Sequence, residues 1–493
     1  MISLLFLIFI LTIIATAATY FIKRYHRAFG IISFFILFLI FAVYSILTFS
    51  SYHSGIMDAS QFPLAVNKYI DIDFSIGLTG LTASLSAVAY IITIFALLIS
   101  NMEDSISTGL IATAGLGLIG LFISRDFLFF FIFWEIAILA VFFIIYRYGR
   151  LQRRSISIKF FIYMHVGSLF LLLGFFALAT YYYIDFHIIS FSFQQLLNYT
   201  FFSTIPAFGA GFIIFSLLLV FLIKLPIFPL HGWLADSYNS APYSGTVMLA
   251  GGLGMMGGYG LFGIMYPLLI NVLSHDVSYI LIGLGILSLI YFSTASVFQE
   301  SIKMMLAYLS AADLSFVLIS FGVSLISHGK VSVLAASGGM YQIIAASFLI
   351  TMAFASLFII YKKTGTEMIY RLGGITRNAP FLAGFTLMAF VGILGLPGFT
   401  PFISEFSIII SSFQSIGAFS IIIVIGLMII AASLIWAAQR ALFGPYNENL
   451  GSIKDLNKPE FLILLGLFAL AVLSGIYPDI FFKIISIYAG GVI

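Results

Sequence analysis

The stretch that decides the fold is residues 212–233, FIIFSLLLVFLIKLPIFPLHGW. An apolar run from Phe212 to Ile223 leads directly into Lys224, and Pro226 and Pro229 follow within five residues. A lysine near the centre of a bilayer costs roughly 2.5–3.5 kcal/mol on insertion scales, so such residues face a protein interior or a hydrated cavity on an ion path. A helix broken beside such a charge indicates a membrane protein that moves ions.

Three more ionisable residues lie in strongly apolar stretches, namely Glu135, Asp313 and Glu405. Together with Lys224 they imply an insertion cost on the order of 10 kcal/mol. That cost equals the whole folding stability of an ordinary domain. A bundle with a purely structural role would have little reason to keep four such groups.

Composition places the chain in the membrane without any motif. Of its 493 residues 62% are hydrophobic, 17% aromatic and only 8% charged. Apolar stretches of about 20 residues, each able to cross a hydrocarbon core roughly 30 Å thick, recur along the whole chain. We predict an all-α integral membrane protein with about fourteen spans, packed as one polytopic domain over residues 1–493.

The lysines and arginines are sorted between alternate loops. With the spans numbered from Met1, most of the 21 basic residues fall in the odd-numbered loops. The positive-inside rule puts those loops in the cytoplasm and both termini outside the plasma membrane. The first apolar segment lacks a preceding basic region and a small-residue cleavage site, so we expect a retained span and not a signal peptide.

The chain contains no cysteine, and no dinucleotide or phosphate-binding glycine loop is found where a strand meets a helix. No set of His, Asp and Glu at helical spacing argues for a metal. We therefore expect no cofactor and no metal, and no redox chemistry in this chain itself. Lipid surrounds the predicted bundle, and a nucleic acid is not an expected partner.

Two predicted spans are interrupted in matching ways. Residues 225–229 (LPIFP) break the seventh span, and residues 396–401 (LPGFTP) break the twelfth. Proline removes a backbone donor, and in lipid the freed carbonyls need other helices, hydroxyls or water as partners. Paired breaks of this kind suggest an internal repeat, with the ion path at its interface.

Glu135, midway along the fifth span, is the natural partner of Lys224. A carboxyl beside an ammonium forms a site whose affinity for a proton depends on their separation. The alternative is a static buried ion pair. His165, near the start of the sixth span, is expected to be a packing residue rather than a relay.

The other candidates carry structural alternatives as well. Glu405 is either a proton exit group or a carboxylate that caps the half-helix after the second break. Asp313 is either a relay or a structural group hydrogen-bonded by Ser310 and Ser315. His231, after the first break, is a weaker candidate that could hydrogen-bond the freed carbonyls.

Several short motifs recur together from about residue 75 onward: Phe133-Trp134-Glu135, Lys159-Phe160-Phe161, Lys224-Leu225-Pro226, Pro229-Leu230-His231-Gly232-Trp233, Ile302-Lys303 with Leu306-Ala307-Tyr308, and Gly395-Leu396-Pro397-Gly398. This set resembles the antiporter-like subunits of respiratory complex I. That family has relatives in membrane-bound hydrogenases and in multi-subunit cation/proton antiporters. Glutamate at position 405, where related subunits carry lysine, favours the M-type subunit.

The resemblance implies fourteen helices with two inverted five-helix repeats. Helices 1–3 fall in residues 1–100, the first repeat (helices 4–8) in 108–271, the second (helices 9–13) in 278–441 and helix 14 in 459–493. Helices 7 and 12 are the broken ones. Protons would pass along a hydrated axis from Glu135 and Lys224 to Glu405, and the partners would be other membrane subunits of a hetero-oligomer.

The centre of the implied path departs from the family. Met255 occupies the position of the central relay lysine, Asp313 and Ala346 occupy positions of histidines, and Tyr238 replaces another histidine. Three accounts remain open: Asp313 and water replace the centre, the chain is a non-conducting scaffold, or Asp313 and Glu405 bind sodium. The favoured function is a proton-translocating subunit of a redox-driven, NADH:quinone oxidoreductase-type complex. A cation/proton antiporter or membrane-bound hydrogenase subunit is the alternative.

Overall fold

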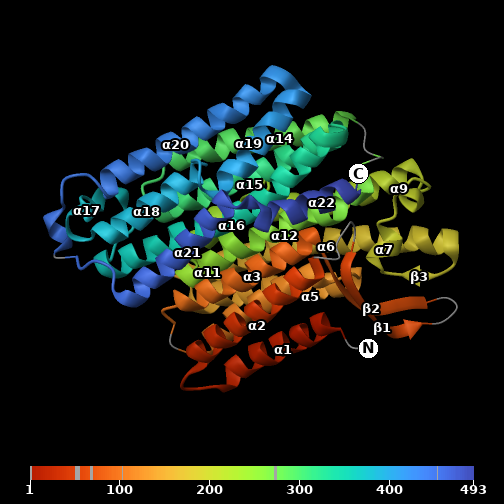
Figure 1. Cartoon of the computed structure of the whole chain (residues 1–493), viewed down its shortest axis with the longest axis horizontal. Coiled ribbons are helices and arrows are strands. Elements are labelled where there is room, and N and C mark those ends of the chain that lie inside the picture. Colours follow the sequence, from red (N-terminus) through yellow and green to blue (C-terminus); the bar gives the residue numbers. More distant parts are fainter. Residues whose placement is uncertain are drawn as a thin grey trace.

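The computed structural model describes residues 3–49, 56–66, 70–102, 104–150, 152–270, 272, 275–451 and 453–492. Long helices lie side by side along the longest axis of the molecule (Figure 1). Their bounds are α1 (Leu4–Phe21), α2 (His26–Phe49), α3 (Gly80–Leu98), α4 (Ser105–Ile123), α5 (Phe127–Tyr148), α6 (Arg153–Phe186), α9 (Ala207–Lys224), α14 (His275–Val297), α15 (Ile302–Ile326), α16 (Gly329–Thr364), α18 (Pro380–Ile393), α19 (Thr400–Ile416), α20 (Ile421–Ala441) and α21 (Lys458–Ile476).

One further long helix, residues 243–269, changes its winding along its length. It consists of α11 (Tyr243–Val247), the π-helical η1 (Met248–Leu253), α12 (Gly254–Tyr259), the π-helical η2 (Gly260–Met265) and α13 (Tyr266–Leu269). Short π-helical segments inside α-helices are rare and are frequently found at functional sites. Here they flank the segment that contains Met255.

Short elements connect the long helices. They are α7 (Phe193–Leu196), α8 (Tyr199–Phe202), α10 (Leu234–Ser240), α17 (Ile375–Asn378) and the 3₁₀ turns η3 (Ile369–Arg371), η4 (Gly417–Ser420) and η5 (Glu448–Leu450). The 3₁₀ turn η6 (Pro478–Ile480) and the helix α22 (Phe482–Val492) follow α21.

Thirteen helical stretches of the described residues are long and apolar enough to cross a membrane. One of them, Thr400–Ala441, contains the turn η4 that separates α19 from α20. Counting those two helices separately gives the fourteen spans predicted from the sequence. The all-α membrane fold class is thus confirmed, and the division into two inverted repeats stays a prediction.

The core lies around three central helices: the residue 243–269 helix, α15 and α16. The most apolar stretch of the residue 243–269 helix is wholly buried, and the most apolar stretches of α15 and α16 are nearly so. By contrast, α1, α2, α20 and α21 expose many large apolar side chains on the outside of the bundle. A helix that is apolar all round and buried all round belongs in the centre of such a bundle.

A β-hairpin was not predicted. Strand β1 (Ile56–Val66) pairs antiparallel with β2 (Ile70–Thr79), and the short β3 (Ile189–Ser190) adds parallel to β2. Hydropathy alone puts the start of the third span at residue 75, whereas α3 begins at Gly80, where the Thr79 side chain caps it. The prediction for 75–79 was wrong because apolar strand residues directly precede the apolar helix.

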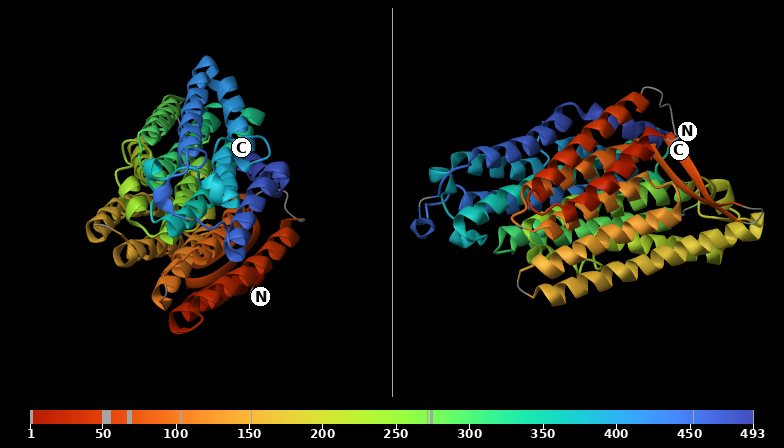
Figure 2. Two further views of the ribbon diagram at one scale, coloured as in Figure 1. Left: turned by 90° about the vertical axis from the view of Figure 1, so that its left-hand side faces the viewer. Right: turned by 90° about the horizontal axis from the view of Figure 1, so that it is seen from below.

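Both predicted interruptions are visible in the chain. Helix α9 ends at Lys224 and the chain turns through 225–233 before α10, while α18 ends at Ile393 and α19 begins at Thr400. Both ends of the chain lie towards the end of the bundle that bears the hairpin (Figures 1 and 2).

Candidate proton path

Lys224 is the last residue of α9 and is 1% exposed. Its ammonium has no hydrogen-bond partner and lies 5.2 Å from the centre of the Trp134 ring. A cation over an aromatic face is attracted by the ring by about 0.5–2 kcal/mol, which is weaker than a buried ion pair. Lys224 is therefore a buried cation without a fixed counter-ion.

Glu135 does not contact Lys224 directly, contrary to the predicted pairing. Lys224 and Glu135 interact electrostatically at longer range, but no ion pair within 4.0 Å joins them. Instead the Glu135 Oε2 lies 3.1 Å from Nε2 of His165, and Glu135 Oε1 has no partner. The sequence shows that both residues lie in apolar spans, but it does not show which way either side chain points.

His165 was weighed as a relay and expected instead to pack, and its contact with Glu135 now places it at the candidate site. It does stack on Phe161 at 3.7 Å, and it also holds the Glu135 carboxyl. The missed signal is positional. Helices α5 and α6 are consecutive neighbours, and Glu135 and His165 are each fifteen residues from Arg150 in the loop between them.

The close approach of the residue 243–269 helix to Lys224 depends on Gly257. A Cβ at this position would lie 2.9 Å from the Leu225 amide nitrogen and 3.0 Å from the Lys224 Cβ. Real Cβ atoms essentially never come so near to a backbone atom, so the two helices would have to separate.

We therefore expect Gly257→Ala to destabilise the protein by about 1–3 kcal/mol, the usual cost of overpacking. The measurement is the thermal midpoint of the purified protein in detergent. The matched control is Gly384→Ala in α18, where an added Cβ meets nothing within 4 Å. Equal midpoints for the two variants would contradict the close approach.

His231 does not bind the carbonyls freed by the first break. Its Nδ1 has no partner, and its ring packs 5.0 Å from the rings of Tyr291 and Phe292. The Trp233 indole N–H donates to the Ile223 carbonyl at 3.1 Å instead. The indole can hydrogen-bond a carbonyl at the helix break in this apolar setting because its single N–H donor is part of a large apolar ring.

Asp313 lies in the middle of α15 and is 3% exposed. The hydroxyls of Ser310 and Ser315 were candidate structural partners, but they donate to the Ala307 and Ala311 carbonyls of their own helix. The Asp313 Oδ1 is left without a partner. An unsatisfied buried carboxyl is costly, which argues against a structural role.

Glu405 lies in the second turn of α19 and does not cap it, because no side chain caps that helix. Its carboxyl packs against Gly395, whose φ of +65° and lack of a Cβ both make room for it. Glu405 Oε1 has no partner. The charge of Asp313 acts on Glu405, so these two carboxyls form a second polar site in the bundle.

Gln342 in α16 extends this second site and was also missed. It is fully buried, its Oε1 accepts a hydrogen bond from the Ser404 hydroxyl, and its Nε2 has no partner. The signal was present in the sequence, because an amide in a long apolar helix cannot satisfy both of its groups locally.

Met255 lies in α12, which packs against α9, α15 and α16. Gly251 and Gly258, four residues before and three residues after Met255, both press against α16, at Thr351 and Ile343. Residues at this spacing share one face of a helix, so Met255 faces α16 as well. Ala346 lies on that helix between the same two contacts, and both residues are buried.

Comparison with known proteins shows the family of the chain. The family described as NADH:quinone oxidoreductase/Mrp antiporter, TM, matches residues 124–431. F(420)H(2) dehydrogenase subunit M of Methanosarcina mazei is 34% identical over 429 residues, which are 85% of this chain and 84% of that protein. NADH-quinone oxidoreductase subunit M of Escherichia coli K12 is 31% identical over 375 residues, 74% of this chain and 70% of that protein.

Solved structures show the same fold. A chain of respiratory complex I from Thermus thermophilus superposes with a TM-score of 0.84 at 23% identity, over 99% of this chain and 98% of that chain. A chain of the Mrp complex from Dietzia sp. gives a TM-score of 0.83 at 18% identity, over 100% of this chain and 52% of that chain. The family match covers more than half of the residues and the curated relatives most of them, so this chain belongs to the NADH:quinone oxidoreductase/Mrp antiporter family of membrane proteins.

Proposed function

We propose that this protein is a proton-translocating, M-type membrane subunit of a redox-driven complex of the complex I kind. Its relatives named subunit M belong to an NADH-quinone oxidoreductase and an F(420)H(2) dehydrogenase, which supports a hetero-oligomer with other membrane subunits. The sorting of basic residues supports a multi-pass position in the plasma membrane with both termini outside.

One observation carries the proposal. Lys224, Asp313 and Glu405 are buried ionisable groups, and each has a polar atom without a partner. Buried ionisable groups without a partner can gain and lose protons as water reaches them. Moving one charge across 100 mV costs about 2.3 kcal/mol, so the energy must come from redox partners outside this chain.

A non-conducting scaffold is the second candidate. It is favoured by Met255 and Ala346, two buried side chains that cannot carry a proton and that stand where the family's relay residues would be. A scaffold needs the chain only for assembly. It predicts that neutral substitutions at Lys224 and Glu135 leave proton movement intact.

The experiment is proton uptake into inverted membrane vesicles that contain the whole complex, energised with NADH or with reduced coenzyme F420, whichever the wild type oxidises. We expect Lys224→Ala and Glu135→Gln to lower the uptake rate per assembled complex by at least fivefold. Lys330→Ala, which removes an exposed lysine, is the matched control. Unchanged uptake in the first two variants would establish the scaffold.

A further inference from the structure

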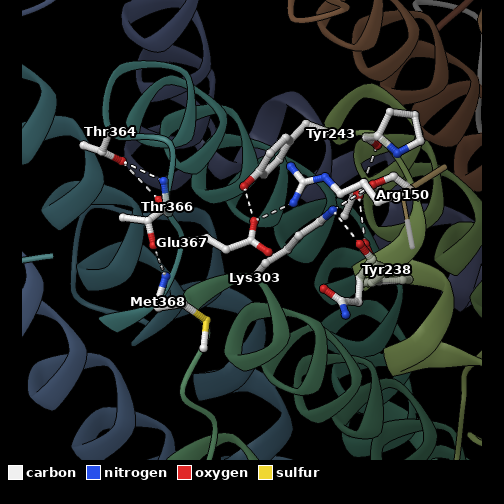
Figure 3. Close-up of polar contacts among 12 residues, drawn as sticks. Arg150, Tyr238, Tyr243, Lys303, Thr364, Thr366, Glu367 and Met368 are labelled. Carbon is white, nitrogen blue, oxygen red and sulfur yellow. Dashed lines mark hydrogen bonds and ion pairs between the residues drawn. The ribbon is translucent and has the colours of Figure 1, made fainter. Parts of the chain in front are cut away.

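A second group of polar side chains, three of them ionised, lies at the opposite end of the bundle from the hairpin, the end that bears the basic loops. It consists of Arg150 between α5 and α6, Tyr243 at the start of α11, Lys303 at the start of α15, and Glu367 after α16. Figure 3 shows these four side chains converging. We call them the basic-end cluster.

Glu367 is the only carboxylate among the four. Its Oε2 accepts hydrogen bonds from the Tyr243 hydroxyl at 2.6 Å and from Nη1 of Arg150 at 3.0 Å. Its side chain is 13% exposed and that of Arg150 29%. Glu367 is thus anchored inside the protein and remains within reach of water.

Lys303 is completely buried directly behind this carboxylate. Its ammonium donates to the carbonyls of Asn239 at 3.2 Å and Ala241 at 2.7 Å, and lies 4.6 Å from the centre of the Tyr243 ring. No ion pair within 4.0 Å joins Lys303 to Glu367, although the two act on each other by charge. Two cations therefore share one carboxylate, and Lys303 is the cation without its own counter-ion.

Polar groups lead from Lys303 towards the centre of the bundle. Ser310 and Asp313 follow Lys303 by seven and ten residues on α15. Seven residues are about two turns and a rise of about 10 Å, so Ser310 returns to the face of Lys303, and Asp313 adjoins it three residues on. The hydroxyl of Tyr238, from α10, interacts with that of Ser310.

We propose that Glu367 and Lys303 form the proton-loading site of this subunit and supply Asp313 along α15. Glu367 takes a proton from water at the basic end, and the Lys303 ammonium gives one towards the Asp313 carboxylate by way of the Tyr238 and Ser310 hydroxyls and water. Glu367 then reprotonates the Lys303 amine, so one proton enters for each one delivered. This inference rests on the proposed proton translocation and deepens it.

Lys303 also has an obvious structural role, because it binds the carbonyls at the end of α10. Arginine separates the two roles. A guanidinium keeps the donors and the charge that hold α10, but it cannot be deprotonated in a protein. Glu367→Gln likewise keeps an oxygen to accept from Tyr243 but cannot take up a proton.

The test uses the vesicle assay described above on Lys303→Arg and Glu367→Gln, with complex assembly measured on native gels. We expect assembly at the wild-type level and proton uptake at least fivefold lower in both variants. Wild-type uptake in Lys303→Arg would show that Lys303 only clamps α10, and would overturn the proposal.

Two comparisons make the result specific. Lys454→Arg changes an exposed lysine at the same end and is expected to retain full uptake. A loss there equal to that of Lys303→Arg would also overturn the assignment. Lys224→Ala separates failure of the proposed function from failure of the loading site. If Lys224→Ala leaves proton uptake unchanged, the proposed function fails. If Lys224→Ala lowers uptake while Lys303→Arg and Glu367→Gln do not, only the loading site fails.

Discussion

Asp313→Asn is expected to reduce proton uptake by at least fivefold while the complex still assembles. Asparagine has nearly the same shape as aspartate, so the packing of α15 is preserved, but an amide cannot accept and release a proton. Asp313 is buried, has an unpartnered Oδ1, lies on α15 between the basic-end cluster and Glu405, and acts on Glu405 by charge. The measurement is donor-driven uptake into inverted vesicles per assembled complex.

The matched control for this prediction is Asp276→Asn, which removes an exposed carboxylate from the first turn of α14. It is expected to retain wild-type uptake. A normal rate in Asp313→Asn would remove Asp313 from the path and leave no titratable side chain identified between Lys224 and Glu405. The scaffold would then be the better description of the protein.

Hydropathy alone gave the fold class, because each long helix must be about 20 apolar residues in order to cross the bilayer. Proline positions gave the two breaks for an equally direct reason. The hairpin was missed although residues 70–79 alternate apolar and polar side chains, which is typical of a strand. When hydropathy is averaged along the chain, Phe74, Ile76 and Leu78 cannot be told apart from the apolar residues of α3. The alternation of the strand is then hidden.

The candidate site was predictable only in part. An ionisable residue in an apolar run is visible in the sequence, and Lys224, Asp313 and Glu405 were found in that way. Contacts are different, since hydropathy fixes how deep a residue lies and not the direction of its side chain. Glu135 therefore contacts His165 from the next helix in the chain instead of Lys224.

The basic-end cluster was hidden for another reason. Arg150 and Glu367 lie in loops, where charged residues are ordinarily solvated, and the sequence gives no sign that they meet. Lys303 is the second residue of α15, next to a loop, where a lysine is ordinarily solvated. Only the three-dimensional structure shows that it is buried behind Tyr243.

Met255→Lys tests whether the altered centre of the path still matters. The new ammonium would replace a buried side chain on the face of α12 that packs against α16. The α16 residues nearest to Gly251 and Gly258 on this face are Thr351 and Ile343, and neither is a carboxylate. If the route passes within about 8 Å of position 255, an unpaired charge there raises the energy of a passing proton by about 2 kcal/mol at an effective dielectric constant of about 20. That is more than tenfold in rate, so we expect proton uptake per assembled complex to fall by at least that factor.

Met255→Leu is the matched control for the change, because volume-conserving apolar exchanges usually cost less than about 1.5 kcal/mol. Assembly must be measured for both variants, since a buried charge without a partner also destabilises the folded protein by several kcal/mol. If Met255→Lys assembles and takes up protons at the rate of Met255→Leu, position 255 lies off the route. Protons would then reach Asp313 without passing α12.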